Sequence, residues 1–117
     1  MEGGGYFVDG FINGKKVDFQ VDTGATVVGL SLKDANKLKI RLKKRDKILV
    51  GLAGGKTADG WSTTLKSVRV GDIELKNVSA MVIDSRKYDV ILLGMSFLDK
   101  LEISQSGKTM ILKYNPH

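Results

Sequence analysis

The 117-residue sequence contains no cysteine, one proline and one histidine, and each shortage removes a class of site. Without cysteine, the chain cannot form disulfides, thiolate metal sites or a cysteine nucleophile. A single histidine, His117, gives no basis for a Ser-His-Asp triad or a histidine-based metal site, so we expect neither a metal nor another cofactor. No apolar run approaches the roughly 18 to 20 residues that a helix needs to cross a bilayer, so we expect no spanning helix in this sequence.

The remaining composition is that of an ordinary globular domain. Hydrophobic residues make up 42% of the chain and charged residues 27%, a balance that argues against disorder. The length corresponds to about one domain. We therefore expect a flexible tail over residues 1–5, which are rich in glycine, and one domain over residues 6–117.

The net charge of +6 comes largely from one segment, residues 33–47. Its cations are opposed only by Asp34 and Asp46, and no aromatic side chain lies among them to stack on bases, so we expect no nucleic-acid partner. Two interpretations remain open: a solvated basic surface, or a weak contact with an acidic surface. The cations are Lys33, Lys37, Lys39, Arg41, Lys43, Lys44, Arg45 and Lys47.

The first half of the chain predicts a hairpin that ends in an acidic residue. Residues 6–12 and 16–21 are apolar-rich runs on either side of Asn13-Gly14, a dipeptide typical of two-residue hairpin turns. Residues 17–21 alternate apolar and polar side chains, as in a strand with one buried face. Because this strand runs directly into Asp22, we expect the Asp22 carboxylate at a strand end.

The rest of the sequence predicts an all-β domain with two short helices. Ser31 has the spacing to Asp34 that caps a helix, which would end at about Leu38, and a second helix follows Gly94. A glycine-rich stretch, residues 51–55, lies between two strands and indicates a long hairpin. The further strands are expected at residues 48–50, 61–70, 73–75, 78–83, 90–93, 103–104 and 110–114.

Two eight-residue segments, 27–34 and 92–99, have the same pattern 65 residues apart. In each, an apolar strand meets a glycine, and a serine follows that could cap a short helix: Ser31 in the first and Ser96 in the second. Chance similarity is one interpretation, since short apolar patterns recur easily. The other is a pseudo-symmetric fold built from two related strand-strand-helix units.

The main chemical signal is the sequence Asp22-Thr23-Gly24-Ala25 at the end of an apolar strand. Alone it is weak, because Asp-Thr-Gly is also a sensible turn. Together with the capped helix, the glycine-tipped hairpin and Ile91-Leu92-Leu93-Gly94, it resembles the retropepsin family of aspartic proteases, over residues 6–114. The likeness is greatest to bacterial single-domain members, which have a similar Gly-Met-Ser-Phe-Leu segment at residues 94–98.

The resemblance implies a role for each residue of the motif. Asp22 would supply a catalytic carboxylate, Thr23 would tie two such loops together across a dimer, and Gly24 would donate a backbone amide beside the carboxylate. Residues 51–60 would form the flap, a hairpin that closes over an extended peptide or protein substrate. The implied substrate-binding residues are Ala25, Leu52, Ala53, Gly54 and Gly55.

The resemblance also implies a closed β-barrel or sandwich with a flap hairpin, and a homodimer. Two close carboxylates are needed, and this chain has one such motif, so the second Asp22 would come from another copy. Asp89 is a within-chain alternative, although no Thr-Gly follows it. A catalytically silent dimerisation or peptide-binding domain is the rival function.

Two departures from retroviral members stand out. Residues 102–117 add a hairpin beyond the second helix, so we do not expect dimerisation to follow the retroviral pattern of interleaved terminal strands. Met95 stands where retroviral members commonly have an arginine, which removes a charged contact near the base of the active site. The bacterial likeness further implies tethering to a cell-envelope membrane through an N-terminal segment that this sequence does not contain.

Overall fold

The structure is a computed structural model, and it describes residues 5–85 and 89–114. The expected tail over residues 1–5 therefore lies outside the described residues except for Gly5.

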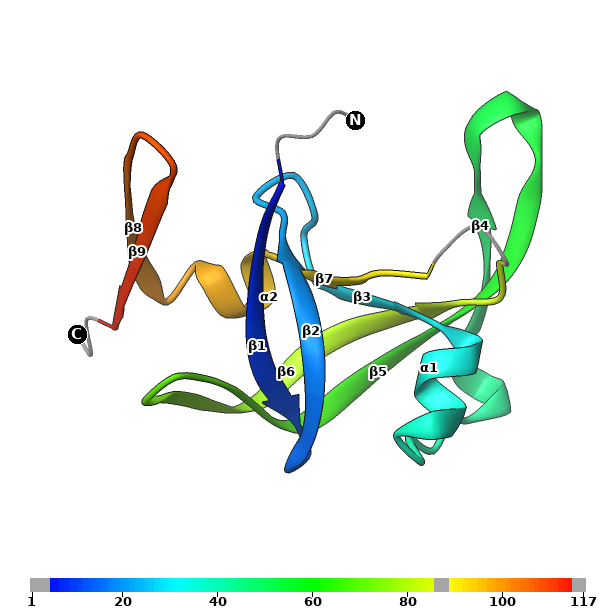
Figure 1. Cartoon of the computed structure of the whole chain (residues 1–117). Coiled ribbons are helices and arrows are strands. Elements are labelled where there is room, and N and C mark those ends of the chain that lie inside the picture. Colours follow the sequence, from blue (N-terminus) through cyan, green and yellow to red (C-terminus); the bar gives the residue numbers. More distant parts are fainter. Residues whose placement is uncertain (1–4, 86–88, 115–117) are drawn as a thin grey trace.

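Six strands close into a barrel, as expected for the predicted fold class (Figure 1). Their order is β1-β2-β7-β3-β6-β5, and a short pairing of β1 with β5 completes the ring, while β4 extends from β5. A separate two-stranded sheet, β8-β9, follows the barrel. The elements are β1 (Tyr6–Ile12), β2 (Lys15–Val21), β3 (Val28–Ser31), α1 (Leu32–Lys37), η1 (Lys44–Asp46), β4 (Lys47–Gly51), η2 (Ala53–Gly55), β5 (Thr57–Val70), β6 (Ile73–Ile83), β7 (Ile91–Leu93), α2 (Met95–Leu98), β8 (Leu101–Ser106) and β9 (Thr109–Tyr114).

The predicted hairpin between β1 and β2 is confirmed. Asn13 and Gly14 have φ values of 51° and 81°, the left-handed conformations that a two-residue hairpin turn needs. Ile12 faces Lys15 across the turn, and the ladder continues to Tyr6 opposite Val21. The hairpin register therefore brings the C-terminal end of β2 to the start of β1.

Two parallel strand pairs are neighbours in the barrel. β2 runs parallel to β7, β3 runs parallel to β6, and β3 meets β7 antiparallel where Gly29 faces Leu92. Helix α1 follows β3 and helix α2 follows β7, which agrees with the interpretation of a pseudo-symmetric fold built from two related units. The helices begin at Leu32 and Met95, however, an offset of 63 residues, so the predicted alignment at 65 is wrong in register by two residues.

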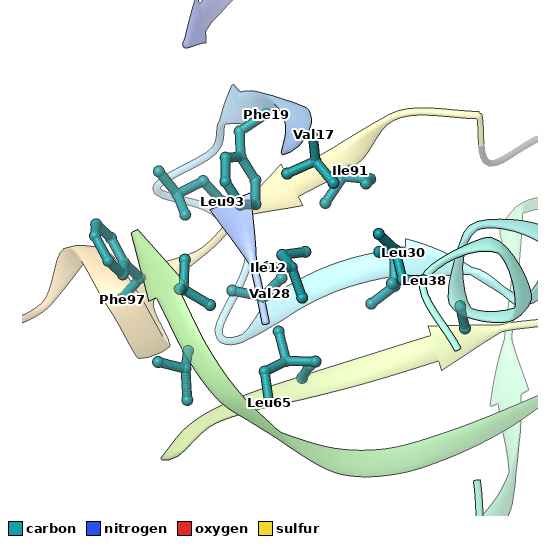
Figure 2. Packing of buried hydrophobic residues seen from close by; sticks show 14 of the residues in the cluster. Ile12, Val17, Phe19, Val28, Leu30, Leu38, Leu65, Ile91, Leu93 and Phe97 are labelled. Carbon is teal, nitrogen blue, oxygen red and sulfur yellow. The ribbon is translucent and has the colours of Figure 1, made fainter. Parts of the chain in front are cut away.

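The core is formed by the inward side chains of all six barrel strands (Figure 2). Alternation along β2 buries Val17 and Phe19, as the sequence pattern predicts, while Asp18 remains exposed. Helix α2 covers one end of the barrel with Phe97 and Leu98, and Ala35 of α1 is also buried. The fully buried large side chains are Phe19, Phe97, Ile12, Leu30, Leu65, Leu93, Leu98, Val28, Val68 and Val82.

The two helices begin in different ways. The Ser31 hydroxyl accepts a hydrogen bond of 3.1 Å from the Asp34 amide, so the predicted cap of α1 is confirmed. The predicted cap of α2 is wrong: Gly94 is the N-cap, without a side-chain hydrogen bond, and Ser96 lies inside the helix. Neither helix, nor any other within residues 5–85 and 89–114, is long and apolar enough to span a membrane.

Several strands are longer than the sequence pattern predicts. β5 begins at Thr57 and not at residue 61, because Thr57 to Gly60 pair in register with β4 despite their small or polar side chains. The strands expected at residues 73–75 and 78–83 form one strand, β6, in which Asn77 has a φ of 56°. Pairing with a neighbouring strand outweighs local propensity at these positions.

The large buried aromatic side chain of β2 provides a test of the core. Phe19→Ala is expected to lower the free energy of unfolding by about 3 to 5 kcal/mol, because it removes a fully buried ring and leaves a cavity. Phe7→Ala on the adjacent strand is the matched control, since the Phe7 side chain is 65% exposed, and it should cost less than about 0.5 kcal/mol. Urea denaturation of both variants measures the difference, and equal losses would contradict this core.

Candidate active site

Asp22 lies directly after the C-terminal end of β2, as the sequence predicts. Its backbone N–H donates to the carbonyl of Leu93 at 3.1 Å, one residue beyond the last paired residues, Val21 and Leu93. The β2–β7 ladder thus extends to the residue that carries the carboxylate. The backbone of Asp22 is held by the barrel itself, and its side chain is half-buried.

The residues after Asp22 form a tight turn that folds back on it. The Gly24 N–H donates to Asp22 Oδ1 at 2.9 Å, and the Ala25 N–H donates to the Asp22 carbonyl at 3.2 Å. A Cβ on residue 24 would lie 3.2 Å from Asp22 Oδ1, so a side chain there would crowd the carboxylate. The loop therefore fixes one carboxylate oxygen, while Thr23 and Gly24 are exposed.

A second group of hydrogen bonds anchors the far side of this loop to the start of α2. The Met95 N–H donates to the Ala25 carbonyl at 2.8 Å. The Ser96 hydroxyl accepts from the Val28 N–H at 3.0 Å and donates to the Ser79 carbonyl at 2.7 Å. Ser96, expected to cap a helix, instead connects β3 to β6 beside the Asp22 loop.

Gly94 allows the loop and α2 to approach this closely. A Cβ at position 94 would lie 2.2 Å from the Val27 carbonyl oxygen and 2.8 Å from the Ala25 carbonyl oxygen. Backbone oxygens cannot move aside as a flexible side chain can, so only glycine fits between β7 and α2. The sequence pattern identified Gly94 as part of a motif, but the contact that requires glycine was visible only in the structure.

The predicted substrate-binding residues 52–55 lie at the tip of the β4–β5 hairpin. Gly51 pairs with Thr57, and the Leu52 N–H donates to the Lys56 carbonyl at 2.7 Å, closing the tip. Gly54 and Gly55 have φ values of 78° and 76°, which residues with a side chain rarely adopt. Figure 1 shows this tip and the loop of residues 22–27 on the same side of the barrel. Ala25 is in that loop, so the predicted binding residues come from two separate elements.

The structure does not bring Asp89 to Asp22. β2 and β7 are parallel, and Asp89 precedes β7 whereas Asp22 follows β2, so the two residues lie at opposite ends of the pair. At roughly 3.3 Å per strand residue, five residues separate them by about 16 Å. Asp89 instead lines a surface groove with Asp18 and Asp34. The within-chain alternative therefore lacks the geometry for a shared proton.

One carboxylate pair that the sequence analysis missed is Asp9 and Asp18, which face each other across β1 and β2. A hydrogen bond that the protonated Asp18 carboxyl donates to Asp9, together with the like charge of Asp9, raises the pKa of Asp18. Both residues are exposed and lie within strands, away from the Asp22 loop. Their equal distance from the Asn13-Gly14 turn was the signal that could have revealed the pair.

Among the described residues no group of three or more His, Cys, Asp or Glu side chains could hold a metal ion.

Comparison with known proteins places this geometry in a family. The family model described as "gag-polyprotein putative aspartyl protease" matches residues 8–100. Two curated relatives are uncharacterized proteins: one from Sinorhizobium sp., encoded in a cobV 5' region, is 33% identical over 80% of this chain and 40% of its own length. The other, from Rickettsia prowazekii (strain Madrid E), is 30% identical over 93% of this chain and 46% of its own length. The chain thus spans less than half the length of these curated relatives.

Two solved structures have the same fold. A crystal structure of a retropepsin-like aspartic protease from Rickettsia conorii is 32% identical, with a TM-score of 0.80, over 95% of this chain and 83% of that chain. EIAV protease in complex with the inhibitor HBY-793 is 25% identical, with a TM-score of 0.64, over 82% of this chain and 86% of that chain.

Because the backbone packs tightly around Gly94, a methyl group added there should destabilise the fold more than one added at a glycine with free space around it. Gly94→Ala should lower the free energy of unfolding by at least about 1 to 3 kcal/mol, because the methyl group would overlap the carbonyls of Ala25 and Val27. Gly29→Ala is the control, since the nearest atom to its Cβ lies 3.7 Å away, an ordinary contact. Thermal and urea unfolding measure both. If Gly94→Ala were as stable as Gly29→Ala, the close approach would be refuted.

Proposed function

This chain belongs to the gag-polyprotein aspartyl protease family of retropepsin-like proteins, and from that premise we propose that it is an aspartic endopeptidase acting as a homodimer. The observation that carries the proposal is the Asp22 carboxylate at the end of β2, held by the Gly24 amide in a loop that the barrel anchors. A carboxylate fixed in this way can take a proton from water and return it. The second carboxylate is the Asp22 of another copy.

The proposed reaction needs two carboxylates that share one proton. The ionised Asp22 accepts a proton from a water molecule, whose oxygen bonds to the carbonyl carbon of the peptide. The protonated Asp22 of the other copy gives its proton to the carbonyl oxygen. The C–N bond then breaks as the leaving nitrogen takes a proton from the first Asp22, and a hydroxyl of the tetrahedral intermediate returns its proton to the second Asp22 as the carbonyl forms again. Like charges this close disfavour double ionisation, which maintains one acid and one base.

The β4–β5 hairpin supports a peptide substrate in this proposal. We assign it the role of flap, with Leu52, Ala53, Gly54 and Gly55 covering an extended peptide and Ala25 below it. The outer edge of β4 has no strand partner in the described sheet, so its backbone groups are available. Extended peptides bind such elements through main-chain hydrogen bonds, and pockets for alternate side chains supply selectivity.

The rival function is a retropepsin-fold domain that dimerises or binds peptides without cleaving them. Incubation with a diverse peptide library distinguishes the two functions, because only the protease would hydrolyse peptides.

Tethering to a bacterial cell-envelope membrane through a preceding N-terminal segment also remains a proposal. Fractionation of cells that produce the full-length protein tests it, and recovery of that protein entirely in the soluble fraction would refute it.

Replacement of the carboxylate tests the catalytic assignment directly. Asp22→Asn should lower kcat/KM by at least about 100-fold, because an amide of the same shape cannot accept the proton of water. Asp89→Asn is the matched control, as Asp89 lies at the opposite end of the β2–β7 pair, and it should retain activity within about twofold. Unfolding transitions of both variants should match the wild type. Activity of Asp22→Asn within tenfold of wild type would remove Asp22 from the mechanism.

Subunit mixing tests whether two chains build one site. After subunit exchange with a ninefold excess of Asp22→Asn, random pairing leaves about one wild-type subunit in ten with a wild-type partner. Activity per wild-type subunit should therefore fall by roughly tenfold. A ninefold excess of Asp89→Asn, which retains Asp22, is the control and should cause no loss. Unchanged activity per wild-type subunit, in a mixture shown to exchange, would contradict the shared site.

A further inference from the structure

A polar groove of about 410 Å³ lies on the outer surface of the barrel, between the segment that leads into β4 and strands β5 and β6. None of its lining residues belongs to the Asp22 loop or to the tip of the β4–β5 hairpin. The lining residues are Arg41, Lys43, Asp46, Ser62, Thr63, Thr64 and Ser79.

The hydroxyl wall of the groove follows from the register of the two strands. Thr64 faces Ser79 across β5 and β6, and both are exposed, whereas the next residues along, Leu65 and Val78, are buried in the core. Ser62 is two residues before Thr64 and is exposed on the same face. The turn η1 packs against β5 and forms the opposite wall. The sheet therefore presents hydroxyl groups toward a segment rich in cations.

The two cations of the groove carry charges that no ion pair within residues 5–85 and 89–114 offsets. Arg41 and Lys43 are exposed, and neither forms an ion pair with another residue that the structure describes. Lys47, in the same basic segment, differs because it pairs with Asp59 at 3.2 Å across β4 and β5. Asp46 is the single acid in the lining, so the groove retains a net positive charge.

We propose that this groove binds a phosphate group. A guanidinium fork can bond two oxygens of a phosphate at once, an ammonium adds a compact charge, and serine and threonine hydroxyls donate to the remaining oxygens. Arg41, Lys43 and the hydroxyls of Ser62 and Thr64 supply these groups from two walls. An apolar ligand would find few partners there. A soluble phosphate compound and the headgroup of an anionic lipid share this chemistry.

Such a ligand would touch strand β5 and the segment that leads into β4, at the base of the β4–β5 hairpin. Arg41 and Lys43 precede η1 and β4, while Ser62 and Thr64 lie in β5, just after its pairing with β4 ends at Trp61. The phosphate would therefore connect the segment entering the hairpin to the strand leaving it. This location separates the groove from the proposed catalytic function, so the groove can be tested without a protease assay.

Titration of the full chain with inorganic phosphate, followed by NMR at constant ionic strength set with chloride, tests the site. We expect saturable shifts confined to amides of residues 41–46, 62–64 and 79, with Kd in the millimolar range. Arg41→Gln combined with Lys43→Gln should weaken binding at least about tenfold. Lys33→Gln combined with Lys39→Gln is the matched control, because it removes two cations of the same segment that lie outside the groove.

Two further variants distinguish a specific phosphate site from non-specific attraction of phosphate to a basic surface. Ser62→Ala with Thr64→Val keeps the net charge but removes two donors, and it should weaken phosphate binding about threefold or more. Asp46→Asn removes the only carboxylate of the lining and should strengthen binding. Thermal unfolding of each variant checks that the fold is intact.

Vesicles distinguish the two sources of phosphate. Binding to phosphatidylglycerol vesicles but not to phosphatidylcholine vesicles, lost in the Arg41/Lys43 double variant, supports the site and identifies a lipid headgroup as its ligand. Saturable binding of inorganic phosphate without vesicle binding supports the site and identifies a soluble ligand. Linear, unsaturated shifts spread over all lysines would overturn the proposal. Equal loss of affinity in the Lys33/Lys39 control would also overturn it.

Discussion

The candidate site depends on the backbone hydrogen bonds that join the Asp22 loop to the junction between β7 and α2. Backbone hydrogen bonds from Asp22 to Leu93 and from Met95 to Ala25 hold the two ends of the loop, and they form only because Gly94 has no side chain. These bonds join segments about 70 residues apart, so the loop conformation requires a closed barrel. The carboxylate geometry is thus a property of the whole fold and not of the Asp-Thr-Gly tripeptide.

Local patterns predicted the elements whose determinants are local. The alternation of residues 17–21 placed Asp22 at a strand end, Asn13-Gly14 gave the hairpin, and Ser31 gave the cap of α1. The misplaced features depend on long-range pairing: β5 starts early because β4 pairs with it, and Ser96 bonds to Val28 and Ser79 where a cap was expected. The groove beside β5 was equally beyond prediction, because its walls come from segments that only the tertiary fold brings together.

The barrel topology also agrees with the proposal that two chains build the site. The parallel pairing of β2 with β7 carries Asp22 to one end of the barrel and leaves Asp89 at the other. Asp89 cannot reach Asp22 without breaking this pairing. In the pseudo-symmetric arrangement, β6 corresponds to β2, and it continues through Ile83 where β2 reaches Asp22. The internal repeat therefore duplicates the strands and the short helix but not the Asp-Thr-Gly motif.

The open edge of β4 has a consequence for how molecules of this protein behave when they are crowded together. Ile48 and Leu49 on this strand are 44% and 70% exposed, next to backbone groups that pair with no other strand in the described part of the chain. Such an edge is a template for non-native pairing between molecules, and charged residues beside it normally oppose that association. Lys43, Lys44, Arg45 and Lys47 are well placed to act in this way. Polyanions that neutralise these cations would weaken the repulsion, so aggregation should depend on the anion of the solution as well as on its ionic strength.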